Sequence, residues 1–167
     1  MGVVEAVSAV AVVAGLLTAV LTLRHRSRPG PARPVAAMVR QAGVLTRYHA
    51  LLVVRSASRF RRWQDLQGRT LSLVDPASTS GALLPRQAMK AQTGMRLEDY
   101  FSRVSYAGSH TRALAAVRDG LVDAAFVSSD SLEMAQQRKA VPAGALRSLW
   151  ISPPLPTDPL VVRRALC

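Results

Sequence analysis

From residue 48 onward the sequence alternates short apolar runs with segments of helical character, and this alternation restricts the fold more than any other feature. Five runs are typical of buried strands, at residues 49–55, 70–74, 102–106, 122–127 and 146–151. Between them, helices are predicted at residues 81–92, 111–119 and 129–138, with one helical turn at residues 63–69. Strands separated by helices form βαβ units, so we expect an α/β fold with three layers and a mainly parallel sheet over residues 69–151.

The strand centres supply the expected core, which consists of Leu71, Leu73, Val104, Ala124, Phe126 and Leu149. Hydrophobic residues make up 49% of the 167 residues, which excludes disorder caused by low hydrophobicity. The single cysteine, Cys167, excludes an intramolecular disulfide framework and a cysteine-based zinc site. We expect neither a metal nor a cofactor.

The net charge of +12 is distributed unevenly along the chain. Residues 1–62 contain ten arginines and one acid, whereas residues 63–167 contain twelve basic and nine acidic residues. A nucleic-acid platform needs aromatic side chains among its basic residues, and few aromatic residues accompany these arginines. We therefore expect no nucleic-acid partner.

Residues 6–23 are an apolar segment without a charge, followed directly by Arg24, His25, Arg26 and Arg28. The segment is long enough for a membrane helix whose basic flank stays cytoplasmic, which argues against clean export. There are two alternatives to a membrane segment: a buried apolar helix, or translated sequence unrelated to the domain. In each case we predict a helix within residues 1–32, which the prolines of residues 28–34 uncouple from the rest. The expected domain boundary lies between residues 33 and 34.

Two loops combine a strand end, polar donors and a helix start. Asp75, Pro76 and Ala77 precede Ser78, Thr79, Ser80 and Gly81, and the second loop reads Ala107, Gly108, Ser109, His110 and Thr111. In sheets of this kind ligands bind beyond the carboxyl ends of the strands, where helix N-termini favour anions. Helix capping by serine and threonine, and a structural role for the histidine, remain open as alternatives.

Together with these loops, several further motifs resemble one family. In chain order they are Tyr48 before a hydrophobic strand, WQDLQGR (63–69), VDPASTSG (74–81), Pro85, YAGSH (106–110), AVRDGLVDAA (116–125) and WISPPLPTDPLVVR (150–163). Over roughly residues 34–164 the sequence is similar to the phosphate, phosphite and phosphonate substrate-binding proteins of ABC transporters.

The resemblance implies a two-lobed periplasmic protein that closes on its ligand and delivers it to a membrane permease. It also implies the residues that hold the oxyanion, which are Tyr48, Ser78, Thr79, Ser80 and His110. Asp130 and Asp158 are looser matches, where a carboxylate accepts a proton from the oxyanion or pairs with a ligand amine.

The match begins part of the way into the family's first lobe. The retained part corresponds to a second lobe at about residues 55–148, with the hinge and remnants of the first lobe on either side. We therefore expect an N-terminally incomplete solute-binding component of an ABC uptake system, located in the periplasm or at an extracytoplasmic membrane surface.

Two other functions compete with this one. The first is a membrane-tethered sensor or accessory domain that uses the same lobe as an interaction module. The second is catalysis by Ser80, His110 and Asp123, which the absence of a G-x-S-x-G motif around Ser80 disfavours. We therefore expect a binding protein and not an enzyme.

Overall fold

The computed structural model describes residues 7–13, 16–22, 32–38, 47–157 and 160–163, with side chains for residues 47–157. The chain divides into two compact units: Met1–Arg47 with Pro156–Cys167 form unit 1, and Tyr48–Leu155 form unit 2. Strand β3 (Ala32–Met38) belongs to unit 1, and the expected boundary between residues 33 and 34 stays a prediction. The assignment of lobes and hinge stays a prediction.

Unit 1 contains an antiparallel sheet with the order β1-β2-β3-β11, where β1 is Val7–Val13, β2 is Leu16–Thr22 and β11 is Leu160–Arg163. The predicted apolar helix is therefore wrong for these residues: β1 and β2 pair along their whole length, from Val7 opposite Thr22 to Val13 opposite Leu16. Valine and threonine are stiff at χ1 and favour strands, and the pairing satisfies the backbone as a helix would. Within the described ranges, no helix is long and apolar enough to cross a membrane.

Unit 2 is built on a mixed sheet of five strands with the order β7-β6-β8-β5-β9. These strands are β5 (Ala50–Arg55), β6 (Thr70–Leu73), β7 (Arg103–Tyr106), β8 (Ala124–Ser128) and β9 (Leu146–Ile151). Strand β6 is parallel to β7 and β8, while β5 is antiparallel to β8 and β9. Four strands thus share one direction and β5 opposes them, which confirms the α/β fold. Short strands β4 (Arg47–Tyr48) and β10 (Leu155–Pro156) form a separate pair.

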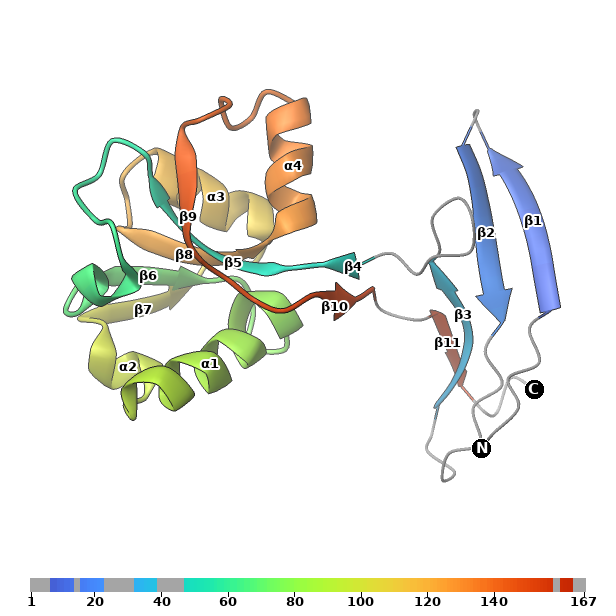
Figure 1. Cartoon of the computed structure of the whole chain (residues 1–167), viewed down its shortest axis with the longest axis horizontal. Helices are drawn as coiled ribbons and strands as arrows, with labels where there is room; N and C mark the ends of the chain where they lie inside the picture. The colour runs from blue at the N-terminus through green and yellow to red at the C-terminus, as the bar shows by residue number, and fades with distance from the viewer. Residues whose placement is uncertain (1–6, 14–15, 23–31, 39–46, 158–159, 164–167) are drawn as a thin grey trace. The chain divides into compact units, whose positions relative to one another are not determined.

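Helices cover both faces of this sheet (Figure 1). On one face lie α1 (Leu84–Thr93) and α2 (Leu97–Tyr100), and on the other lie α3 (His110–Arg118) and α4 (Ser129–Gln137). The 3-10 turn η1 (Trp63–Leu66) precedes β6, and the π-helical turn η2 (Thr79–Leu83) leads directly into α1. The predicted helix over residues 81–92 is therefore a π-helical turn followed by an α-helix.

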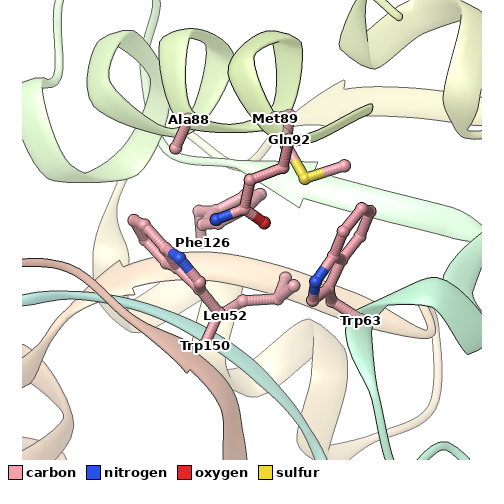
Figure 2. Close-up of a pocket in the computed structure, with 7 residues that line it drawn as sticks. All are labelled: Leu52, Trp63, Ala88, Met89, Gln92, Phe126 and Trp150. Carbon is pink, nitrogen blue, oxygen red and sulfur yellow. The ribbon is translucent and has the colours of Figure 1, made fainter. Parts of the chain in front are cut away.

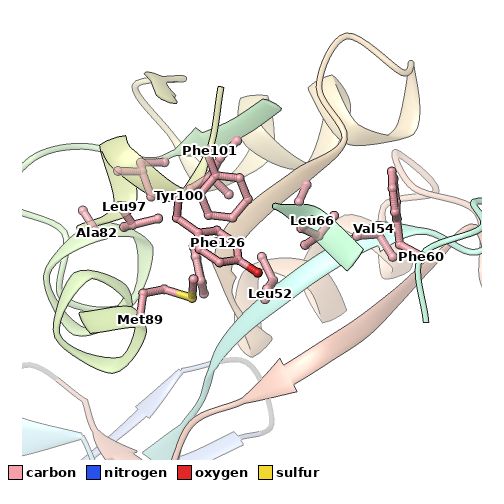
Figure 3. Packing of buried hydrophobic residues seen from close by; sticks show 13 residues of the cluster. Leu52, Val54, Phe60, Leu66, Ala82, Met89, Leu97, Tyr100, Phe101 and Phe126 are labelled. Carbon is pink, nitrogen blue, oxygen red and sulfur yellow. The ribbon is translucent and has the colours of Figure 1, made fainter. Parts of the chain in front are cut away.

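The core consists of two clusters, one under each helical layer. Alternate residues of β5 divide between them: Leu52 and Val54 join the α1 side, and Leu51 and Val53 the α3 side. The first cluster gathers around Phe126 (Figure 3). Of the six residues predicted as core, Leu71, Leu73, Ala124 and Phe126 are fully buried. Val104 and Leu149 are only partly buried, because they lie on the edge strands β7 and β9.

Candidate functional site

The two polar loops lie where the parallel strands end, at the side of the sheet that we call the ligand edge, because β6 and β7 are parallel neighbours in register. Leu73 pairs with Tyr106 at the carboxyl ends of these strands. Just beyond this pair, the Ala107 N–H donates to the Leu73 carbonyl at 2.8 Å, and the Gly108 N–H donates to the Val74 carbonyl at 2.7 Å. The loops that contain Ser78–Ser80 and His110 therefore start side by side.

In the first loop, Ser78 is the N-cap of η2. Its Oγ accepts a hydrogen bond from the Gly81 N–H at 3.1 Å, and its carbonyl accepts from Ala82 and Leu83. Thr79 is exposed and Ser80 is 3% exposed, and among the described residues no hydrogen bond engages either hydroxyl. Their N–H groups belong to the first turn of a helix, where the backbone donors have no intrahelical acceptor. Thr79 and Ser80 therefore provide free donors at a positive helix end, whereas Ser78 has a capping role.

The tight approach of η2 to β6 requires glycine at residue 81. A Cβ at this position would lie 2.5 Å from Cγ2 of Val74 and 2.9 Å from Oγ of Ser78. Only glycine lets the turn pack this closely against the strand end, and this packing positions Thr79 and Ser80.

His110 is the first residue of α3, after the N-cap Ser109, whose Oγ accepts from the Arg112 N–H at 3.2 Å. The imidazole Nδ1 accepts a hydrogen bond from the Ser128 N–H at 3.1 Å. Nδ1 therefore carries no proton, and the neutral ring bears its proton on Nε2. Burial lowers the pKa of His110 below its usual value of 6.5, and the negative charge of Asp130 opposes this effect. A neutral His110 presents a single N–H donor.

Asp130 lies in the first turn of α4, which begins directly after β8. The Ser129 hydroxyl donates to its Oδ1 at 3.1 Å, and Oγ of Ser129 accepts from the His49 N–H at 3.0 Å. The carboxylate is exposed and exerts its charge on His110, so it belongs to the same edge as the two loops.

The antiparallel strand β5 brings its amino end to this edge, which the sequence analysis did not anticipate. Ala50 pairs with Ser128, and its N–H donates to Oγ of Ser152 at 2.9 Å. His49 donates from Nδ1 to the Ser152 carbonyl at 2.8 Å. The missed residues are thus His49, Ser128, Ser129 and Ser152. The signal for two of them was Ser128-Ser129-Asp130, a third polar loop between a strand and a helix.

The seven predicted site residues therefore have different outcomes. One edge of the sheet holds five of them, Ser78, Thr79, Ser80, His110 and Asp130. Tyr48 is half-buried and lies two residues before Ala50, at the start of β5 on the same edge. Asp158 lies outside the described residues. Asp123 is at the opposite edge, where its Oδ2 accepts from the N–H and hydroxyl of Thr70 at 2.9 and 2.8 Å. It therefore does not form a triad with Ser80 and His110.

A small pocket lies elsewhere in unit 2, between α1 and the sheet (Figure 2). Two indole rings flank it, and the amide of Gln92 extends between them (Figure 2). Its lining residues are Leu52, Trp63, Ala88, Met89, Gln92, Phe126 and Trp150. This lining offers few donors, so the pocket does not suit an anion.

Three helices thus begin at one sheet edge, through η2, α3 and α4, and their first turns present N–H groups, hydroxyls and one neutral imidazole. Their dipoles favour an anion at this edge. The fold and this edge define a ligand-binding lobe of the type found in periplasmic binding proteins. The family model for the ABC transporter, phosphonate, periplasmic substrate-binding protein matches residues 2–167, and the chain belongs to this family.

Individual relatives agree with this assignment. The chain is 32% identical, over 123 residues, to the phosphonates-binding periplasmic protein of Escherichia coli K12, and the match covers 71% of this chain and 36% of that protein. A binding-protein component of an ABC phosphonate transporter from Pseudomonas aeruginosa superposes with a TM-score of 0.68 and 28% identity, covering 81% of this chain and 44% of that one. A protein from Prochlorococcus marinus, solved in complex with methylphosphonate, shares the fold with a TM-score of 0.58 and 21% identity, covering 66% and 43%. The chain therefore spans less than half the length of each of these relatives.

Proposed function

We propose that this chain provides the oxyanion-binding lobe of an ABC uptake system for phosphonate, phosphite or phosphate. The observation that carries the proposal is the pair of hydroxyls of Thr79 and Ser80, which no hydrogen bond engages in the described part of the chain, at a helix N-terminus on the same edge as His110. Family membership supports the same ligand class.

Each group has a distinct role in this proposal. The hydroxyls and N–H groups of Thr79 and Ser80 donate to the oxygens of the ligand, and His110 donates from Nε2 without adding a charge. The Asp130 carboxylate accepts a proton from a protonated oxygen or pairs with an amine of the ligand. Tyr48 and Asp158 are assigned as further contacts by family resemblance alone.

The chemistry of this edge favours binding over catalysis and a small anion over a polymer. It offers neutral donors and one carboxylate in place of the dense basic surface that nucleic acids require. No metal or cofactor enters the proposal. By analogy with its relatives, the protein acts in the periplasm and its partner is the membrane permease of the transporter.

Calorimetric titration of the full chain with methylphosphonate, phosphite and inorganic phosphate tests the proposal. We expect saturable binding of at least one anion, and Thr79→Ala should weaken it by about 1–3 kcal/mol, the usual contribution of a charge-assisted hydrogen bond. Ser148→Ala is the control, because Ser148 is exposed and lies within β9, outside the loops that form the site. Absence of binding to all three anions would refute the binding function and leave the lobe as an interaction module.

A further inference from the structure

The opposite edge of the sheet carries a group of cationic side chains, around the loop that follows β5. The loop cluster, as we call it, consists of Ser58, Arg59, Phe60, Arg61, Arg69 and Arg147. Arg69 directly precedes β6 and Arg147 is the second residue of β9, so both lie where these strands begin. The candidate anion site lies at the other end of the same strands.

Two of the four guanidinium groups are fixed to a short stretch of backbone. Arg147 donates from Nη2 to the carbonyls of Ser58, at 3.1 Å, and Phe60. Arg61 donates from Nη1 to the same Ser58 carbonyl at 3.2 Å.

The aromatic ring of Phe60 holds the other two arginines. The guanidinium carbons of Arg59 and Arg69 lie 6.0 and 5.7 Å from the centre of this ring, within the range of a cation–π contact. Phe60 itself is 7% exposed and belongs to the core cluster, where it lies beyond Val54 and Leu66 (Figure 3). These contacts hold the guanidinium groups of Arg59 and Arg69 against a side chain of the hydrophobic core.

The charge of the loop cluster is not neutralised within residues 47–157. The ion pairs found there involve Arg62, Arg86, Arg96 and Arg118, and none of the four cluster arginines. The nearest acid in the sequence, Asp65, accepts from the backbone N–H groups of Arg61 and Arg62 and lies 3.7 Å from Nη2 of Arg62.

Three buried polar atoms of the cluster have no hydrogen-bond partner among the residues that the structure describes: Oγ of Ser58, Nε of Arg69 and Nε of Arg147. Buried polar groups in proteins almost always have a partner, so such orphaned atoms call for a specific explanation. Two guanidinium Nε donors and a hydroxyl at one loop match the acceptors of an oxyanion, which arginine binds through its planar array of N–H groups.

We propose that the loop cluster is a second anion site, which binds a phosphate group. A single carboxylate would neutralise only one of the four charges, whereas a phosphate carries more charge and more acceptor oxygens. Free inorganic phosphate and the phosphate of a lipid headgroup share this chemistry. The site does not depend on the function proposed for the opposite edge.

Nitrogen-15 NMR of the arginine Nε–H groups, on the full chain titrated with inorganic phosphate, observes this site directly and separates it from the opposite edge. We expect the Arg69 and Arg147 signals to shift and saturate, while those of Arg96 and Arg138, which are exposed elsewhere, move only slightly. Parallel, non-saturating shifts of all four signals would show general screening and overturn the proposal.

The double substitution Arg69→Lys/Arg147→Lys keeps both charges and removes both Nε donors. We expect phosphate affinity at the loop cluster to fall about tenfold or more, observed through the Nε–H signals of Arg59 and Arg61, whereas Arg96→Lys/Arg138→Lys has no effect. Thermal unfolding of both variants establishes that they fold. An unchanged affinity in the folded double variant would overturn the site.

Vesicle sedimentation distinguishes the two phosphate sources. Binding to phosphatidylglycerol vesicles and not to phosphatidylcholine vesicles, lost in Arg69→Lys/Arg147→Lys, would assign the site to a lipid headgroup. Saturating NMR shifts with inorganic phosphate but no sedimentation would assign it to free phosphate. If neither saturating shifts nor variant-sensitive sedimentation is found, the proposal is wrong.

Discussion

His110 and Ser128 are joined across two elements, because the imidazole Nδ1 accepts a hydrogen bond from the Ser128 N–H at 3.1 Å. The first residue of α3 is thereby tied to the last residue of β8. The same bond leaves the proton of the neutral ring on Nε2, the atom that the proposed function uses to hold an oxyanion.

The burial of His110 makes stability depend on pH. Because burial lowers the pKa of folded His110 below 6.5, the unfolded chain binds more protons between the two pKa values, so stability falls as pH falls through that window. Above the unfolded pKa the contribution of this histidine is complete. We expect urea unfolding of His110→Gln to show a weaker loss of stability from neutral to mildly acidic pH than the wild type. Equal pH dependence in the two proteins would contradict this assignment.

Gly81→Ala should destabilise unit 2 and impair anion binding together. The new methyl group would lie 2.5 Å from Cγ2 and 2.6 Å from Cβ of Val74, so η2 has to move away from β6. Overpacking of this kind costs about 1–3 kcal/mol. Chemical denaturation measures the effect, and Val74→Ala in the Gly81→Ala background should restore part of the stability, because it removes the Cγ2 contact while the Cβ contact remains. A strictly additive double variant would show that the two residues do not clash.

Asp130→Asn should change which ligands are preferred. Loss of the negative charge removes the partner of a ligand amine, so an aminoalkylphosphonate should lose affinity relative to methylphosphonate in calorimetric titrations. The matched control is Glu133→Gln, on the same helix, where the carboxylate accepts from Gln137 at 3.2 Å. A parallel effect on both ligands would indicate that Asp130 contributes only general electrostatics.

Asp123→Ala should destabilise the fold but leave anion binding intact. Asp123 and Thr70 bond reciprocally: the carboxylate accepts from the Thr70 N–H and hydroxyl, and Oγ1 of Thr70 accepts from the Asp123 N–H at 2.9 Å. Removal of the carboxylate leaves a half-buried donor pair unsatisfied and should lower the free energy of unfolding by about 1–3 kcal/mol. Binding that falls in a variant which remains folded would place Asp123 in the ligand site.

Much of unit 2 could be predicted because its signals are local. Apolar runs such as Ala50–Arg55 and Ala124–Ser128 have a strand pattern, and glycines and serines mark the helix boundaries. The two loops could be placed on one edge because β6 and β7 are parallel neighbours, whose carboxyl ends necessarily meet. Residues 7–13 and 16–22 form strands and not the predicted helix, since a continuous apolar run has no periodicity that separates the two and pairing decides between them.

The sequence by itself thus determined the α/β class, the buried strand centres and the polar loops after β6 and β7, because propensity and periodicity act between near neighbours in the chain. Only the tertiary structure decided that β5 runs against β8, which brings His49 to the ligand edge, where it bonds to Ser152. The parallel pairing of β6 with β8 places Asp123 at the opposite edge. It also decided that Val104 and Leu149 lie on edge strands, and that Arg69 and Arg147 meet at Phe60. The reason is that strand order and direction depend on pairings between distant segments, which leave no mark in the local pattern of either strand.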